Sequence, residues 1–195
     1  ENGKFEFTVI GGTEPKGICG SGLIDILAQL FVNGYIDKKG KFTEKADTST
    51  KDGRKLLTII DGVHISEDDI KNAILTKAAI YSASESLVKG LGVSMNDLEN
   101  IYIAGGFGNF INTESAIAIG MLPDVPRERF VYLGNASLAG AKHALLSSSV
   151  RSRISDVFER MTYVDLSSDP TFSDEYMSAL FIPHTDASRF PSYTR

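Results

Sequence analysis

The fold is decided by residues 101–111, which read Ile101-Tyr102-Ile103-Ala104-Gly105-Gly106-Phe107-Gly108-Asn109-Phe110-Ile111. A β-branched and aromatic run leads directly into two glycines, and this pattern predicts a buried strand that ends in a turn. Ligands of open α/β sheets lie beyond the carboxyl ends of the strands, where a backbone without side chains can approach a flat or phosphorylated ligand. The alternative is a tight strand-to-helix turn without a ligand, and the diglycine alone favours that alternative.

On both sides of this stretch, strand patterns alternate with helix patterns, which predicts a mixed or parallel sheet covered by helices. We expect strands near residues 5–10, 56–60, 101–104, 129–133 and 162–166. We expect helices over 23–31, 66–89, 114–121, 136–146, 150–161 and 173–181. The polar segment 35–60 is expected to be an insertion or a small hairpin, and 183–195 an extended C-terminal tail.

Composition narrows the class of protein. The chain has 195 residues, of which 42% are hydrophobic, and its net charge is −5. The absence of a basic cluster argues against nucleic acid as a partner, and the absence of a long apolar run argues against a membrane span. Cys19 is the single cysteine, which excludes an internal disulfide and predicts a reducing, cytoplasmic location. The first methionine is Met95, so we expect the chain to be a piece of a longer protein.

Two further features could belong to a ligand site. Gly17-x-x-Gly20-x-Gly22 precedes a helix, whose free amides would favour an anion or a hydroxyl-rich ligand, although a tight turn explains the glycines equally well. Lys77 lies in the middle of the apolar stripe of the helix over 66–89. A lysine there either extends its ammonium to solvent or reaches into a cleft. The three histidines show no metal-ligand spacing, and we identify no catalytic set.

Several segments together resemble the C-terminal half of the reductive activators of corrinoid proteins. These are ferredoxin-like iron–sulfur proteins fused to an ATPase domain of the actin, sugar kinase and heat-shock chaperone superfamily. The matching segments are Gly17–Asp25, Lys77–Ile80, Ile103–Ile111, Tyr132–Ala141 and Ala179–Asp186, in this order. The resemblance implies that residues 1–182 form the C-terminal half of an actin-like ATPase domain, an α/β fold of the ribonuclease-H type with a mixed twisted sheet.

The same resemblance implies a set of nucleotide-binding residues. Gly105, Gly106 and Phe107 match the adenosine motif, and Gly20, Ser21 and Gly22 match a segment near the ribose. Lys77 occupies the helix position that reaches the nucleoside in the chaperone branch. We therefore expect these residues to meet in one open cleft, with ATP and Mg²⁺ shared with a half that is not in this chain.

The sequence also departs from the family pattern. It contains no Asp-x-Gly-Thr or Asp-x-Gly-Gly, so the phosphate-binding loops are missing, and so is the cysteine-rich segment that would hold a 2Fe–2S cluster. The resemblance implies that the full-length protein reduces cobalt(II) corrinoid proteins to cobalt(I) with ATP. Two alternatives are a non-catalytic actin-like binding module and half of a small-molecule kinase of the same superfamily.

Overall fold

The structure is a computed structural model that describes residues 7–105 and 110–193. Its α-helices are α1 (Gly20–Val32), α2 (Glu67–Gly90), α3 (Thr113–Ala118), α4 (Ala136–Leu146), α5 (Ser148–Arg160) and α6 (Pro170–Ala179). Its strands are β1 (Thr48–Lys51), β2 (Arg54–Ile60), β3 (Val63–Ser66), β4 (Ile101–Ala104) and β5 (Phe130–Gly134). Short 3₁₀ turns include η1 (Ile10–Gly12), η2 (Met95–Asp97), η4 (Arg127–Arg129), η5 (Leu166–Ser168), η6 (Ala187–Arg189) and η7 (Pro191–Tyr193).

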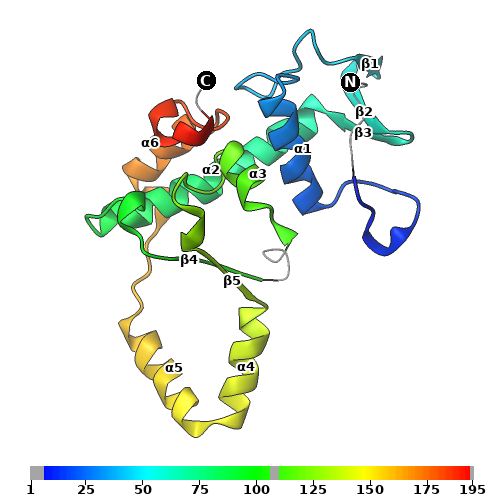
Figure 1. Cartoon of the computed structure of the whole chain (residues 1–195). Helices are drawn as coiled ribbons and strands as arrows, with labels where there is room; N and C mark the ends of the chain where they lie inside the picture. The colour runs from blue at the N-terminus through cyan, green and yellow to red at the C-terminus, as the bar shows by residue number, and fades with distance from the viewer. Residues whose placement is uncertain (1–6, 106–109, 194–195) are drawn as a thin grey trace.

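The strands form two separate sheets (Figure 1). β1, β2 and β3 make an antiparallel meander in which Thr48 pairs with Leu57, and Leu57 with Ile65. Strands β1 and β2 of this meander lie within the segment 35–60, and β3 follows that segment. β4 and β5 pair in parallel, with Ile101 opposite Phe130. The predicted strands at 101–104 and 129–133 are therefore present, and they are neighbours.

Two predicted strands are wrong. Residues 7–9 are irregular and lead into η1, while residues 5 and 6 lie outside the described part of the chain. Residues 161–165 are also irregular and lead into η5. Both segments have β-rich sequences, but a strand is stable only when another strand and a covering layer complete it. Met161 and Tyr163 are instead among the most exposed apolar side chains.

Helix α2 is the central element of the fold, and a capping box fixes its start. The Ser66 hydroxyl accepts a hydrogen bond from the Asp69 amide, and the Asp69 carboxylate accepts one from the Ser66 amide. Its buried stripe joins two cores. Ile70 and Ile74 pack in a core with α1 and α3, whereas Ala78 and Tyr81 pack in a second core that includes Phe130 and Phe190.

The C-terminal segment differs from the expected extended tail. Residues 187–189 and 191–193 form 3₁₀ turns, and both His184 and Phe190 are buried. Such short turns have no helical or strand periodicity, so the sequence pattern could not reveal them. The segment also approaches the residue after α3 closely, because a Cβ added to Gly120 would lie 2.0 Å from the carbonyl oxygen of Pro183.

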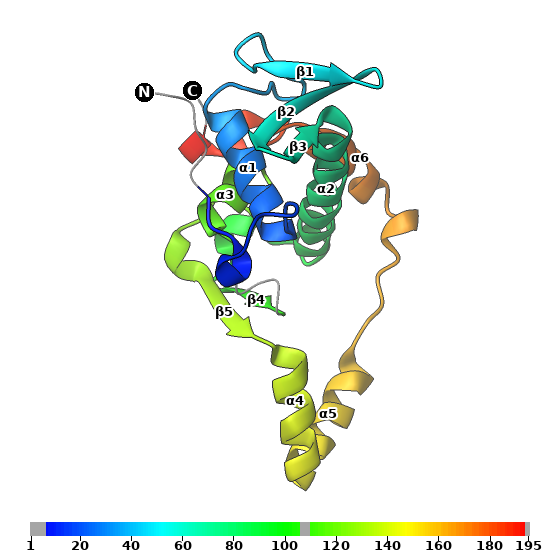
Figure 2. The same cartoon turned by 90° about the vertical axis from the view of Figure 1, so that its right-hand side faces the viewer.

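Helices α4 and α5 form an arm that extends away from the rest of the molecule in both views (Figures 1 and 2). Neither helix contains a buried residue. An extended stretch, residues 161–165, leads from the arm back toward α6, which packs along α2. Among the described residues, no helix is both long and apolar enough to cross a membrane.

Candidate functional site

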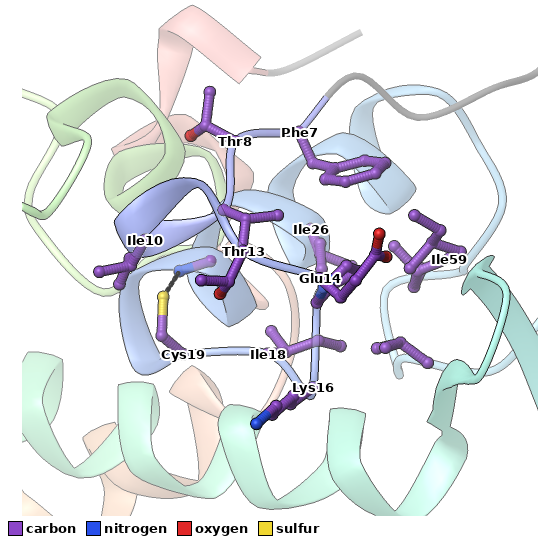
Figure 3. A pocket seen from close by; sticks show the side chains of 16 residues that line it. Phe7, Thr8, Ile10, Thr13, Glu14, Lys16, Ile18, Cys19, Ile26 and Ile59 are labelled. Atoms are coloured by element: carbon purple, nitrogen blue, oxygen red, sulfur yellow. Dashed lines mark hydrogen bonds between the residues drawn. The ribbon is translucent and has the colours of Figure 1, made fainter.

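The glycine-rich loop before α1 borders a pocket of about 340 Å³. Three segments contribute apolar side chains to it: the loop before η1 contributes Phe7, α1 contributes Ile26, and β2 contributes Ile59 (Figure 3). Polar side chains at its edge include Glu14 and Lys16. The pocket is thus largely apolar with a few polar groups, a composition typical of small-molecule sites.

The first turn of α1 brings Gly22 into this pocket. Cys19 is the N-cap of the helix, and its Sγ accepts a hydrogen bond from the Gly22 amide at 3.4 Å (Figure 3). The same Sγ lies 3.4 Å from the Ser21 hydroxyl oxygen. The Ser21 hydroxyl, followed by the Gly22 amide, lowers the pKa of the exposed Cys19 thiol. The first amides of a helix have no acceptor within the helix, so those of Gly20 and Ser21 can serve a ligand.

The diglycine begins where the parallel sheet ends. Gly105 follows β4 directly, its φ is +111°, and its amide donates a hydrogen bond to the Gly134 carbonyl at 2.7 Å. Residues with an L side chain rarely adopt this φ, so glycine is favoured here even though an added Cβ would meet no atom within 4 Å. The end of β4 and the start of α1 lie on the same side of the molecule in Figures 1 and 2. Gly106 and Phe107 lie outside the described residues.

Lys77 is not open to a cleft. Its side chain is fully buried, and Nζ donates hydrogen bonds to the carbonyl oxygens of Phe181 at 2.6 Å and Pro183 at 2.7 Å. Burial lowers the pKa of this amine to about 7. The lysine therefore neither extends its ammonium to solvent nor lines the pocket before α1. The two carbonyl oxygens explain a buried lysine without any nucleotide, which removes the main argument for Lys77 as a ligand contact.

A charged cluster that the sequence motifs did not indicate lies between α2, α6 and the C-terminal segment. Glu175 is buried and forms ion pairs with Lys89 and Arg189. Burial alone would raise the pKa of Glu175, but hydrogen bonds from Arg189 and Lys89 outweigh burial and lower it. The four-residue spacing of Glu85 and Lys89 is visible in the sequence, whereas Glu175 and Arg189 are far from both in sequence.

His184 completes this cluster. Its Nδ1 accepts a hydrogen bond from the Asp186 amide, and its buried Nε2 lies 3.6 Å from a Glu175 oxygen without a hydrogen bond. Burial, followed by the nearby Arg189, lowers the pKa of this imidazole. The cluster holds the C-terminal segment on α2 and α6, and it does not line the pocket before α1. Among the described residues, no three side chains are grouped to hold a metal ion.

The parallel β4–β5 pair and the helices around it make this an α/β domain, and the comparisons place it in the actin-like ATPase class. A family model described as the C-terminal domain of RACo, the ASKHA domain, matches residues 1–194. The chain belongs to this family, and the resemblance inferred from its sequence motifs is thereby confirmed.

Known relatives agree with this assignment. The corrinoid activation enzyme RamQ of Eubacterium limosum is 34% identical over 91% of this chain. A [Co(II) methylated amine-specific corrinoid protein] reductase of Methanosarcina barkeri is 28% identical over 87% of the chain. A solved structure, described as a reductive activator for corrinoid, iron-sulfur protein, matches 96% of the chain with a TM-score of 0.87 and 39% identity. The chain spans about a third of each of these proteins: 33%, 30% and 32%.

Proposed function

We propose that this chain is the nucleotide-binding C-terminal part of a reductive activator that acts on a corrinoid protein. The observation that supports this proposal most strongly is the match to the solved activator. It covers 96% of the chain, with 39% sequence identity and a TM-score of 0.87. Both curated relatives also act on corrinoid systems according to their names. The full-length protein would reduce cobalt(II) corrinoid protein to cobalt(I), with ATP driving an otherwise unfavourable electron transfer.

In this proposal, adenosine binds between the start of α1 and the end of β4. The amides of Gly20 and Ser21 would face the ribose, together with Gly22, which borders the apolar pocket. Gly105, with Gly106 and Phe107 after it, would contact the purine by backbone approach. Lys77 is left out of the direct contacts, because its amine already donates to two buried carbonyl oxygens.

The residues of this chain cannot bind the 2Fe–2S cluster that would carry the electron. A 2Fe–2S cluster has four ligands, of which at least two are cysteine thiolates, and this sequence has a single cysteine, Cys19. We therefore assign the cluster to the part of the polypeptide outside these 195 residues. The phosphate loops and the Mg²⁺ ligands are assigned there as well, since no Asp-x-Gly-Thr or Asp-x-Gly-Gly occurs here. The single free thiol favours a reducing compartment, and we place the protein in the cytoplasm.

The test uses the full-length gene product with a cobalt(II) corrinoid protein and a low-potential electron donor. We expect ATP-dependent appearance of the cobalt(I) absorption band, with loss of the cobalt(II) electron paramagnetic resonance signal. Phosphorylation of a small molecule without any cobalt reduction would support the kinase alternative instead. Nucleotide-independent binding to a partner, with neither reaction, would support the binding module.

A further inference from the structure

His184 lies in the buried junction between the C-terminal segment and helix α2. It is only 2% exposed, and its ring lies against those of Tyr81 on α2, with centroids 5.5 Å apart, and of Phe190, at 6.3 Å. Figure 1 shows the end of the chain lying beside α6. Burial disfavours the charged form of a base, so the ring is neutral in these surroundings. Whether it can take up a second proton depends on what its two nitrogens contact.

One ring nitrogen of His184 carries no proton in this arrangement. The Asp186 amide donates a hydrogen bond to Nδ1 at 3.0 Å, so Nδ1 is an acceptor and the neutral ring has its hydrogen on Nε2. An imidazolium has a hydrogen on both nitrogens. A protonated Nδ1 would face the Asp186 N–H, donor against donor, and the hydrogen bond would be lost. Protonation of His184 is therefore incompatible with this bond.

The other ring nitrogen offers little compensation. Nε2 is buried, lies 3.6 Å from a Glu175 oxygen and has no hydrogen-bond partner among the described residues. Glu175 already accepts hydrogen bonds from Arg189, at 2.8 and 3.2 Å, and from Lys89. A third cation beside this carboxylate would lie close to Arg189 and be repelled by it.

Charged and titratable groups surround His184 from each element that packs on it. They are Lys77, Tyr81, Glu85 and Lys89 on α2, Glu175 on α6, and Asp186 and Arg189 on the C-terminal segment itself. Burial and the Arg189 charge outweigh the attraction of Glu175 and hold the pKa of His184 below its ordinary value of about 6.5. A conformation that frees the ring restores that value, so it binds more protons below about pH 6.5, and acidification favours it.

The bond between His184 and Asp186 fixes the start of a short turn that holds the end of the chain. Asp186 is the N-cap of η6, and its carboxylate accepts hydrogen bonds from the Ser188 amide and hydroxyl. At the end of this turn Arg189 reaches Glu175, and Phe190 is fully buried in the second core. Loss of the bond at Asp186 therefore loosens the residues that attach the segment to α2 and α6.

We propose that residues 184–190 form an acid-sensitive latch, in which protonation of His184 breaks its bond to the Asp186 amide and releases Arg189 and Phe190 from α2 and α6. The latch is closed at neutral pH, and its open form becomes populated below about pH 6.5. Opening uncovers the second core beside Tyr81, against which Phe190 packs, so the junction of α2 with α6 loosens as well. This device is a property of the fold and does not rest on the proposed function.

Hydrogen–deuterium exchange of the full-length protein at pH 7.5 and pH 5.5 tests the latch. Protection of the amides of residues 184–190, corrected for intrinsic exchange, should be about five- to tenfold lower at pH 5.5. His184→Asn should abolish this difference, because the asparagine oxygen can accept the amide two residues on but does not titrate. His64→Asn is the matched control, since His64 is exposed and lies outside the latch, and it should keep the difference. Amides of α1 should stay better protected than the latch at both pH values.

Several results would overturn the latch. Equal protection at both pH values would show that His184 does not switch, and a pH response that persists in His184→Asn would assign the proton to another group. Exchange of the latch no faster than that of α1 at pH 5.5 would mean that the protein unfolds as a whole. If His184→Asn does not fold, exchange of the ring C2 hydrogen gives the pKa of His184 in the unmodified protein. A pKa below about 6.5 supports the latch, and a pKa at or above that value overturns it.

Discussion

At the scale of single residues, Lys77 shows what a sequence pattern can and cannot determine. Helical periodicity correctly places it within the apolar stripe, where a charged side chain needs a partner. The partners are carbonyl oxygens of Phe181 and Pro183, more than 100 residues further along the chain. Backbone carbonyls have no sequence signature, so their approach to a given lysine is a product of the tertiary fold alone.

The position of Lys77 predicts a specific pH dependence of stability. Its pKa is about 7 in the fold and about 10.4 in an unfolded chain, so the unfolded state binds more protons between these values. The contribution of Lys77 to the free energy of unfolding therefore rises with pH between about pH 7 and about pH 10.4. At pH 9 we expect Lys77→Met to lower the free energy of unfolding by about 2–4 kcal/mol, because two buried carbonyl oxygens lose their donor.

Urea denaturation at pH 7 and pH 9 checks this prediction. The deficit of Lys77→Met relative to the unmodified chain should shrink by about 1 kcal/mol for each pH unit toward pH 7. Lys71→Met is the control, because Lys71 is an exposed lysine on the same helix, and it should have little effect at either pH. A deficit that is the same at both pH values would show that the folded amine keeps an ordinary pKa.

At the scale of elements, sequence patterns predicted the six α-helices of the described residues but only some of their strands. A helix satisfies its backbone locally, and signals such as the Ser66–Asp69 capping box lie within a few residues. A strand depends on partners elsewhere, so the β-rich segments 7–10 and 162–166 could not be assigned from their own residues. The two strands that were predicted near the diglycine and at 129–133 do have each other as partners.

The junction between α3 and the C-terminal segment offers a test at this scale. Gly120 has φ +75°, and an added Cβ would lie 2.0 Å from the carbonyl oxygen of Pro183. A contact this short forces the C-terminal segment off α3. We expect Gly120→Ala to lower the free energy of unfolding by about 3 kcal/mol or more, from backbone strain and displacement together.

Gly34→Ala is a closely matched control for that variant. Gly34 has φ +74°, but an added Cβ would meet no atom within 4 Å. It should therefore cost only the strain of an L residue in the left-handed region, about 1 kcal/mol. Both variants are compared by thermal and urea denaturation. If Gly120→Ala and Gly34→Ala lowered the free energy of unfolding equally, the C-terminal segment would move away from Gly120 at little cost. It would then not be held against α3.

At the scale of the whole molecule, the nucleotide site stays a prediction, to which this chain would supply only a part. The motifs correctly indicated the family, and both the start of α1 and the end of β4 lie on one side of the molecule. The partners of the Lys77 side chain could not be predicted from its own helix, because they lie in the distant C-terminal segment. The groups that would hold phosphates and Mg²⁺ are absent from the sequence, so no pattern within it could complete the site.

This division of the site predicts weak nucleotide binding by the 195-residue chain. In the proposed site, the residues present would offer backbone contacts to purine and ribose, whereas the phosphates would depend on loops that this sequence lacks. A ligand held by half a site still loses its translational and rotational freedom in full. We expect a dissociation constant for ATP with Mg²⁺ in the millimolar range at best, equivalent to about −4 kcal/mol or weaker. Hydrolysis should not exceed background, because catalysis needs a positioned metal and water.

Calorimetric titration of this chain with ATP and Mg²⁺, together with a phosphate-release assay, measures both quantities. The full-length protein is the positive control and should bind ATP at least about a hundredfold more tightly, a difference of about 2.7 kcal/mol. A micromolar dissociation constant for the 195-residue chain would mean that the start of α1 and the end of β4 suffice to hold the nucleotide. Turnover by this chain would place the catalytic groups within these 195 residues, contrary to the division proposed for the site.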